Sequence, residues 1–422
     1  MTTWRPLKRF CALHSEYGLN IGSEHYVDGG VRLVRTTDIT SAGHLTGEES
    51  AVFVSREDAE GRELQDGDLL FSRSGTLGRC LLYDGPPRAA TFAAYLVRFR
   101  VMEGYDPRYI AYCAQGKFFS ETIRTEATQS TIANFNAEKF AGLLLPWHSA
   151  ADQRAIADFL DAETARVDVL IEKKQRMVGL LAERRMSMMT EGVAGLLTET
   201  STRPSSLPWL PQVGVAWREV RLSLVARQGT GHTPGRDHPE WWVDCTIPWI
   251  TTGEVAQVRS DRVEYISETR EMISELGAAN SSAEIHPAGT VVLCRTASAG
   301  YSAIMGTDMA TSQDFATWTC GPLLKPRFLL LCLRAMRQDL LGRLAMGSTH
   351  KTIYMPDIEG LRIPLPPVET QDRIVHEVWS RLQTSDAIIE ALSAQIDLLI
   401  ERRQALITTA VTGELEVPGV AA

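Results

Sequence analysis

Two short polar segments carry the side chains of this chain that are best suited to contact a nucleic acid. Residues 72–79 read Ser-Arg-Ser-Gly-Thr-Leu-Gly-Arg, and residues 294–301 read Cys-Arg-Thr-Ala-Ser-Ala-Gly-Tyr. Arginine can bridge a guanine with two hydrogen bonds, while hydroxyl groups and exposed amides reach phosphate oxygens. A polar β-turn without a function explains either segment about equally well. The candidate DNA contacts are Arg73, Ser74, Thr76, Arg79, Arg295, Thr296, Ser298 and Tyr301.

Two further pairs of polar segments occupy matching places in the two halves of the chain. Residues 35–39 correspond to residues 251–255, and residues 129–134 correspond to residues 347–352. The hydroxyl and amide groups of the second pair suit the DNA backbone, and they could equally cap the turn before a helix. These segments add the candidates Arg35, Thr36, Ser130, Thr131, Asn134, Thr251, Thr252, Ser348, Thr349 and Lys351.

The sequence contains none of the catalytic motifs that act on nucleic acids or nucleotides. The only Gly-Lys pair is followed by Phe118, so the phosphate-binding loop of nucleotide hydrolases is missing. Residues 106–109, Asp-Pro-Arg-Tyr, lack the second proline of the methyltransferase element that holds a flipped base, and we predict a helix N-terminus there. Asp168 and residues 172–174 fall on a long helix, where a metal pocket has no walls. No histidine spacing suits a metal. We expect neither catalysis nor a bound metal or cofactor.

A duplication organises the chain. Residues 180–185 read Leu-Leu-Ala-Glu-Arg-Arg, and residues 398–403 read Leu-Leu-Ile-Glu-Arg-Arg, at an offset of 218. The same offset, without a gap, pairs Pro146 with Pro364, Gln153 with Gln371, Ile156 with Ile374, Asp168 with Asp386, Glu172 with Glu390, Thr190 with Thr408 and Gly195 with Gly413. Two copies of one unit imply a target with two parts.

Each copy begins with strand and turn chemistry and ends with a long helix. The first part is rich in Gly, Pro, β-branched and aromatic residues, and residues 68–71 and 290–293 are predicted strands. The second part lacks proline for about fifty residues and ends near a glycine, which is typical of a helix. We predict an α+β protein with recognition domains at 1–146 and 217–364, long helices at 147–197 and 365–415, a Pro-rich, stiff linker at 198–216 and a tail at 416–422.

The two predicted helices carry a heptad-like apolar stripe. At ~1.5 Å per residue, about 45 residues span roughly 65–70 Å, which is longer than a domain of ~150 residues is wide. Each helix must therefore leave its domain, and the most available partner is the other copy. We predict an antiparallel coiled coil with pseudo-twofold symmetry and a dumbbell shape. The predicted interface positions are Ile156, Leu170, Leu181, Met188, Ile374, Ile388, Leu399 and Leu406.

Composition restricts the class of protein. Of the 422 residues, 44% are apolar, which is enough for two or more ordinary cores. The N-terminus lacks the apolar run of a signal peptide, and no segment approaches the ~20 apolar residues of a membrane span, so we expect a cytoplasmic protein. Seven scattered cysteines without a Cys-x-x-Cys motif indicate reduced thiols. The net charge of −9 does not by itself suggest DNA binding, although the two recognition domains are close to neutral.

Several elements together resemble the specificity subunits of Type I restriction-modification systems, and the resemblance covers nearly the whole chain. They are the Leu-Leu-x-Glu-Arg-Arg pair, residues 217–220 (Trp-Arg-Glu-Val), residues 247–254 (Ile-Pro-Trp-Ile-Thr-Thr-Gly-Glu), and residues 363–367 (Ile-Pro-Leu-Pro-Pro) followed by Gln371. The first copy departs from the pattern, since residues 146–149 read Pro-Trp-His-Ser in place of the proline cluster.

This resemblance implies a non-catalytic subunit that reads double-stranded DNA. Each recognition domain would read one half of a bipartite site, and the helices would set the spacing and dock the methyltransferase subunits. The implied partners are two modification and two restriction subunits. S-adenosylmethionine, ATP and Mg²⁺ would then bind those partners, and none of them this chain.

Three alternatives remain open at this point. The chain could be a specificity subunit that serves other effectors, or a helical interaction scaffold without a DNA role. A fused enzyme that both reads and modifies DNA is disfavoured, because no cofactor loop occurs within the 422 residues.

Overall fold

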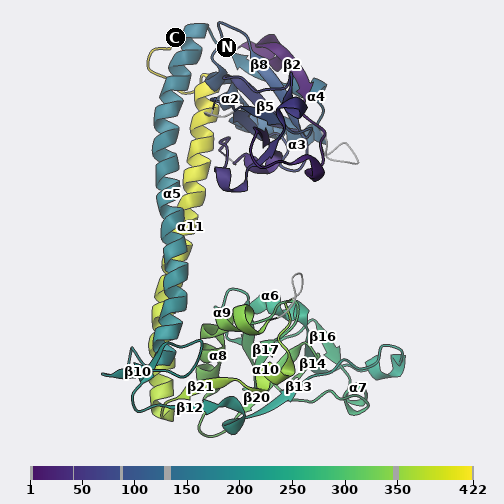
Figure 1. The fold of residues 1–422 in the computed structure, drawn as a ribbon, viewed down its shortest axis with the longest axis vertical. Coiled ribbons are helices and arrows are strands. Elements are labelled where there is room, and N and C mark those ends of the chain that lie inside the picture. Colours follow the sequence, from purple (N-terminus) through teal and green to yellow (C-terminus); the bar gives the residue numbers. More distant parts are fainter. Residues whose placement is uncertain (1–2, 41, 86–88, 128–134, 346–350, 421–422) are drawn as a thin grey trace. The chain divides into compact units, whose positions relative to one another are not determined.

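The computed structural model describes residues 3–40, 42–85, 89–127, 135–345 and 351–420. The chain forms two compact units, each of which mixes helices and sheets, as the sequence predicts (Figure 1). Unit 1 comprises residues 1–176 and 392–422, and unit 2 comprises residues 177–391.

Unit 1 contains a four-stranded sheet in the order β2-β8-β5-β6, a three-stranded sheet in the order β4-β3-β7, and the pair β1-β9. The predicted strand at 68–71 is β5, which is buried along its whole length. The strands are β1 (Thr3–Pro6), β2 (Cys11–Tyr17), β3 (Val31–Val34), β4 (Val52–Val54), β5 (Asp68–Ser72), β6 (Cys80–Leu82), β7 (Ala90–Phe92), β8 (Leu96–Val101) and β9 (Leu144–Trp147).

The helices of unit 1 before the long helix are α1 (Arg56–Ala59), α2 (Pro107–Gln115), α3 (Lys117–Ala127) and α4 (Ala137–Gly142). The helix N-terminus predicted at residues 106–109 is confirmed. The Asp106 side chain accepts a hydrogen bond from the backbone N–H of Arg108, and Pro107 occupies the first helical turn. Both features stabilise a helix start. Helix α2 then packs against β5 and β6.

Unit 2 repeats this plan with a five-stranded sheet in the order β13-β20-β17-β18-β15, a three-stranded sheet in the order β16-β14-β19, and the pair β12-β21. Helix α8 packs against β17 and β18, as α2 packs against β5 and β6. The elements are β12 (Arg218–Arg221), β13 (Ala226–Thr230), β14 (Ile247–Ile250), α6 (Val255–Val258), β15 (Tyr265–Ile266), β16 (Glu271–Ile273), α7 (Glu275–Ala279), β17 (Val291–Cys294), β18 (Ser302–Met305), β19 (Ala310–Thr311), β20 (Phe315–Cys320), α8 (Pro326–Ala335), α9 (Arg337–Asp339), α10 (Met355–Glu359) and β21 (Arg362–Leu365).

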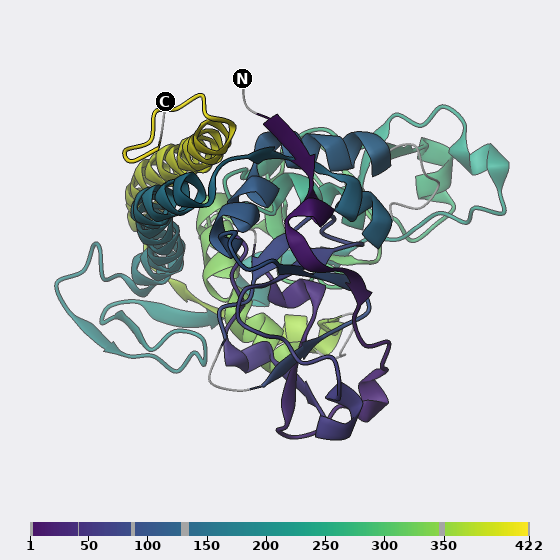
Figure 2. The same ribbon diagram turned by 90° about the horizontal axis from the view of Figure 1, so that it is seen from above.

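The two long helices are α5 (Ala150–Ala194) and α11 (Val368–Thr412), each of 45 residues and related by the offset of 218. Both end at a glycine with positive φ, 86° at Gly195 and 79° at Gly413. The following N–H groups, of Leu196 and Glu414, donate back to Glu191 O and Thr409 O, both at 2.9 Å. This glycine-terminated end satisfies carbonyls that the helix leaves without partners. After Gly413 the C-terminal tail bends back toward α5, and Gly419 lies near Ala155 (Figure 2).

Segments of the two long helices lie side by side inside each unit and run in opposite directions. In unit 1, Asp168 pairs with Arg403 at 2.9 Å and Lys174 donates to Gln395 at 2.5 Å. In unit 2, Arg185 pairs with Asp386 at 3.2 Å. The helix ends also enter the two cores: Ile156 and Leu160 belong to that of unit 1, and Ile374 and Val378 to that of unit 2.

The apolar stripe differs in phase from the predicted heptads. Leu170 and Ile388 are 47% and 44% exposed, and the half-buried residues are the next ones along, Ile171 and Ile389. Ile156 and Ile374 pack in the cores of the two units. A heptad count that starts from them therefore does not mark the face that is buried farther along the helices.

A buried glutamine fixes the start of each long helix to the globular part of its own unit. In unit 1, Gln153 donates to His148 O at 3.0 Å and accepts from the backbone N–H of Asp106 at 3.2 Å. In unit 2, Gln371 donates to Pro366 O at 2.9 Å and accepts from the N–H of Lys325 at 2.8 Å. Both amides are fully buried. These bonds also show that α2 and α8 correspond at an offset of 219.

The linker forms a hairpin, where the sequence predicts a stiff, extended segment. Strands β10 (Thr202–Pro204) and β11 (Gln212–Gly214) pair antiparallel. Arg203 donates to Trp217 O at 3.0 Å and pairs with Glu219 at 2.8 Å. Ser206 also hydrogen bonds to Glu219. The prolines restrict the linker locally, and these contacts with Trp217 and Glu219 fold it back on the following segment.

Neutral polar side chains are buried against the large sheet of unit 2. Thr290 is hydrogen bonded to Thr319 across neighbouring strands at 3.0 Å. His286, of which 1% is exposed, lies 3.4 Å from the hydroxyl of Thr317. Burial lowers the pKa of His286 from its ordinary value, and the negative charge of Glu284 opposes this effect.

Replacing Gln371 by leucine should destabilise unit 2. The substitution removes three buried hydrogen bonds, including the bond from Gln371 to Leu323 O at 2.9 Å. It leaves their partners unsatisfied, so we expect the free energy of unfolding to fall by about 1–3 kcal/mol. Urea unfolding followed by tryptophan fluorescence measures this change, because seven of the nine tryptophans lie in unit 2. The control is Gln383→Leu at an exposed position of α11, and an equal loss in both variants would contradict the role of the buried amide.

Acid should destabilise unit 2 through His286. Because the pKa of His286 is lower in the folded state, the unfolded chain takes up a proton first as the pH falls. The free energy of unfolding should therefore decrease below about pH 6.5, the ordinary histidine value, until the folded pKa has been passed. His286→Gln should make the free energy of unfolding less dependent on pH in this window. The exposed His232→Gln is the control, and unchanged pH dependence in His286→Gln would contradict the assignment.

Candidate nucleic-acid interface

The two predicted recognition loops adopt closely similar backbone structures. Each follows an inner strand of its main sheet, β5 in unit 1 and β17 in unit 2. The N–H of Gly78 donates to Ser72 O at 2.8 Å, and the N–H of Gly300 donates to Cys294 O at 2.8 Å. These glycines have φ of 80° and 87°. Corresponding residues in the two loops therefore stand in corresponding places.

The backbone N–H and the backbone carbonyl of each loop arginine are both hydrogen bonded. The N–H of Arg73 donates to Tyr95 O at 3.0 Å, and Arg73 O accepts from Phe135 at 3.1 Å. The N–H of Arg295 donates to Asp314 O and its carbonyl accepts from Ile353, both at 2.8 Å. The segments before the long helices thus hold the loops, which makes the loops rigid supports for their side chains.

The side chains of the two loops are held differently. The Arg73 guanidinium lies 4.7 Å from the ring centroid of Tyr17, and Arg79 donates to Ile39 O at 2.5 Å. In unit 2, Arg295 Nε donates to Gln313 O at 2.9 Å, and Thr296 donates to Asp314 at 2.5 Å. Ser74 and Ser298 are half-buried, and Thr76 is exposed. Tyr301 is half-buried beneath Arg337, whose guanidinium lies 4.5 Å from its ring.

The second pair of segments forms short 3₁₀ turns, at Thr36–Asp38 and Thr252–Glu254. Each turn ends in a buried carboxylate, Asp38 or Glu254. Arg35 is engaged inside the domain, since it pairs with Asp38 at 2.9 Å and donates to Ser50 O at 2.8 Å. Thr36, Thr251 and Thr252 are half-buried around the same turns.

The third pair of segments is described only in part. Lys351 is exposed, and its ammonium group donates to Leu341 O at 3.1 Å. The other candidates there lie outside the described residues: Ser130, Thr131, Asn134, Ser348 and Thr349.

The predicted helix contacts fall into three groups. Ile156 and Ile374 are buried in the cores, and Leu170 and Ile388 are exposed. The half-buried positions are Leu181, Met188, Leu399 and Leu406.

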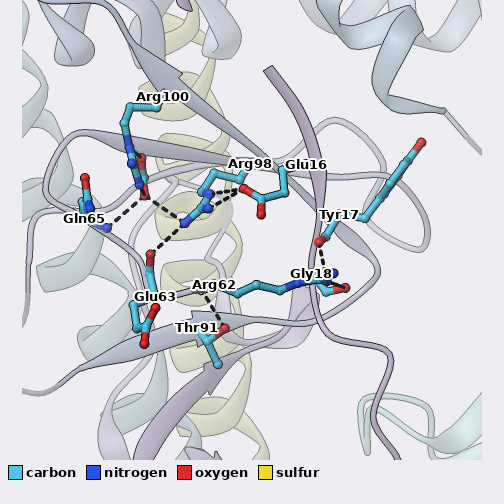
Figure 3. Close-up of polar contacts among 10 residues, drawn as sticks. Glu16, Tyr17, Gly18, Arg62, Glu63, Gln65, Thr91, Arg98 and Arg100 are labelled. Atoms are coloured by element: carbon cyan, nitrogen blue, oxygen red, sulfur yellow. Dashed lines mark hydrogen bonds and ion pairs between the residues drawn. The ribbon is translucent and has the colours of Figure 1, made fainter. Parts of the chain in front are cut away.

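A charged network behind the first loop was not predicted from the sequence (Figure 3). Asp68, which is fully buried, accepts two hydrogen bonds from Arg100 at 2.7 and 2.8 Å. Arg98 pairs with Glu16 and donates to Glu63 O at 2.7 Å. The residues come from strands far apart in the sequence, so no local spacing reveals the network.

Residues next to this network in the sequence also hold Tyr17, whose ring lies beneath the Arg73 guanidinium. Arg62 donates to the carbonyls of Tyr17 and Gly18 at 2.9 and 3.0 Å, and Thr91 donates to Arg62 O at 2.9 Å (Figure 3). The Tyr17 hydroxyl accepts from the N–H of Ala137 at 3.1 Å. The ring beneath Arg73 is thus fixed at both ends, and Tyr17 is a positioning residue that sequence reasoning missed.

The described part of the chain contains no group of three or more His, Cys, Asp and Glu side chains that could hold a metal ion. All seven cysteines are free, and burial raises the pKa of the Cys11 and Cys320 thiols to about 12. Such thiols are protonated at neutral pH and are poor nucleophiles. Among the described helices, none is both long enough and apolar enough to cross a membrane.

Comparisons with known proteins agree on one family. The family model described as Type I restriction modification DNA specificity domain matches residues 214–401, which include the recognition domain of unit 2. The EcoBI specificity subunit of Escherichia coli is 21% identical over 396 residues, covering 92% of this chain and 80% of its own. The StySPI specificity subunit of Salmonella potsdam is 22% identical, covering 78% of this chain and 70% of its own.

Solved structures show a similar fold. A chain from a study of complex assembly and conformational transition in the type I R-M system has a TM-score of 0.68 at 18% identity, covering 98% of both chains. The HsdS subunit of Thermoanaerobacter tengcongensis has a TM-score of 0.50 at 18% identity, covering 98% of this chain and 97% of its own. The duplicated scaffold, its paired loops and these relatives lead to one conclusion: the chain is similar over most of its length to the specificity subunits of Type I restriction-modification systems, and residues 214–401 match the family model.

Proposed function

We propose that this chain is the non-catalytic DNA-reading subunit of a Type I restriction-modification complex, in which each recognition domain reads one half of a bipartite site. The observation that carries the proposal is the pair of loops after β5 and β17. They share backbone hydrogen bonds and differ in side chains. One scaffold that presents two different sets of polar groups is suited to two different half-sites.

The proposed contacts are of two kinds. Arg73 and Arg295 are placed to read base edges, because guanidinium groups on a fixed main chain can bridge guanine. The hydroxyl groups of the same loops, such as Thr76 and Ser298, suit phosphate oxygens. The net charge of −9 indicates that partner subunits supply much of the phosphate neutralisation.

The long helices are proposed to form an antiparallel coiled coil with pseudo-twofold symmetry, which sets the distance between the half-sites. The support comes from two ion pairs, Asp168 with Arg403 and Arg185 with Asp386. At the offset of 218, Asp168 corresponds to Asp386 and Arg185 corresponds to Arg403. Each pair thus joins the aspartate of one copy to the arginine of the other, as a twofold relation requires.

The exposed apolar residues of these helices are proposed to dock two modification subunits, which in turn join two restriction subunits. Leu170 and Ile388 correspond at the offset of 218, as do Leu180 and Leu398, which are 55% and 64% exposed. Exposed apolar side chains in matched positions suit two copies of one partner. S-adenosylmethionine, ATP and Mg²⁺ would bind those partners, and the chemistry would take place there.

Methylation mapping tests the proposal directly. A host free of DNA methylation would carry this chain together with the methyltransferase encoded beside it, and its DNA would be read by single-molecule sequencing. We expect adenine methylation at one split motif with a fixed gap. An assembled complex that produces no new methylation would contradict the proposal and favour a scaffold without a DNA role.

The loop arginines should each affect one half-site. Arg73→Ala and Arg295→Ala should each weaken binding by about 1–3 kcal/mol, because each removes a bridging contact to a base. Competition between oligonucleotides altered in one half-site or the other assigns each loop to its half. The exposed Arg176→Ala on α5 is the control. Unchanged binding by both loop variants would remove these loops from the interface.

The helix pairing should depend on Leu181 and Leu399. Replacing both by aspartate puts two like charges into the proposed seam, so we expect loss of assembly with the modification subunits or loss of the fixed gap. Light scattering of the complex and methylation mapping measure the two outcomes. Glu183→Ala with Glu401→Ala changes exposed positions of the same helices as a control. Normal assembly and an unaltered motif in the aspartate variant would contradict the coiled coil.

A further inference from the structure

Unit 1 contains a cavity of about 680 Å³ between its recognition domain and its helix segments. Residues of α2 line one side, including Tyr112 and Gln115, and residues of α5 line another, including Asp161 and Thr164. The volume lies in the range of ordinary ligand sites, roughly 300–1,000 Å³. The DNA-reading function does not use this space.

The corresponding space in unit 2 is filled by the protein itself. The buried glutamines set the correspondence, at an offset of 219 for α2 and α8 and 218 for α5 and α11. Gln115 then corresponds to Arg334, Asp161 to Trp379, and Thr164 to Leu382. Arg334 and Leu382 are 0% and 1% exposed.

In unit 2, an arginine side chain occupies the position that corresponds to Gln115. The Arg334 guanidinium lies 5.4 Å from the ring centroid of Trp379 and donates to Asp261 O at 2.6 Å and to Val263 O at 2.7 Å. Its Nε lies 3.4 Å from the Asp261 carboxylate. In unit 2, Arg334 therefore connects the domain to helix α11. Unit 1 has the shorter, neutral Gln115 at the corresponding position.

The charge around the cavity favours a cation. Five carboxylates and three guanidinium groups line it. Two of the guanidinium groups are already engaged, Arg108 with Asp161 at 2.6 Å and Arg403 with Asp168 at 2.9 Å. The third, Arg154, is exposed, as are Asp66 and Asp84. An excess of carboxylates disfavours a phosphate, so DNA is a poor occupant.

We propose that this cavity is a socket for an arginine side chain carried by a modification subunit, which there takes the place that Arg334 occupies in unit 2. The inference rests on the proposed function. The choice of partner follows from position. Ala165 in the wall lies one helical turn before Val169, which is 47% exposed on α5, and Arg403 in the wall lies one turn after Ile400, which is 49% exposed on α11. The socket is therefore continuous with the apolar surface proposed to dock that subunit. Its absence from unit 2 makes the two docking sites unequal.

Removing charge tests the socket without disturbing packing. Asp66→Asn with Asp84→Asn changes two exposed carboxylates, and we expect binding of the purified modification subunit to the full-length chain to weaken about tenfold at low salt. The control is Glu268→Gln with Glu275→Gln, which makes the same charge change at exposed positions of unit 2. Titration calorimetry measures both. Equal affinity in the two double variants would overturn the proposal.

Filling the socket gives a second test. Gln115→Arg with Asp161→Trp copies the residues of unit 2, and we expect native mass spectrometry to show one bound modification subunit fewer than with the wild-type chain. If this variant does not fold, the affinity of the Asp66→Asn, Asp84→Asn variant tests the proposal alone. A photo-crosslinking residue in place of Asp84 should capture a modification-subunit peptide that contains an arginine, and crosslinks confined to this chain would overturn the proposal.

The two proposals fail in different ways. Absence of split-motif methylation by the wild-type complex would reject the proposed function itself. Normal methylation and a normal motif by the wild-type complex, combined with unchanged affinity in the socket variants, would reject the socket alone.

Discussion

The buried glutamine at the start of each long helix is the constraint on which the rest of the structure depends. Gln153 and Gln371 each connect a helix to the first turn of the domain helix, α2 or α8. That domain helix packs against the strands that flank the recognition loop. A rotation of the domain about its long helix would break buried hydrogen bonds, which are costly to leave unsatisfied. Loop direction and helix direction are therefore fixed together within each unit.

The sequence predicts those features whose signals are local or duplicated. The strands at β5 and β17, the start of α2 at Asp106 and the helix ends at Gly195 and Gly413 all follow from turn and capping residues. The sequence identifies the candidate loops because similar residue types follow a predicted strand in both copies. Their place in the structure agrees with the prediction, and their contacts with DNA remain a prediction.

Features that depend on distant residues could not be predicted. The network of Asp68, Arg98 and Arg100 needs the strand register, which the sequence does not reveal. The pairing of Arg35 with Asp38 is local in sequence, but it depends on the burial of the Asp38 carboxylate, which the packing of the whole domain determines. The predicted stripe on the long helices is one residue out of phase at Leu170, because the heptad count starts from Ile156, which packs in the core of unit 1.

The loop at residues 294–301 shows what determines its backbone conformation. Ala297 has a φ of 55°, at the position that Gly75 occupies with 70° in unit 1. An alanine in this left-handed conformation is destabilised by roughly 1–2 kcal/mol, so its own preference does not select it. The surrounding scaffold imposes the turn. Side chains in such a loop can change during evolution while the turn persists, which leaves sequence preference free to diverge on a constant architecture.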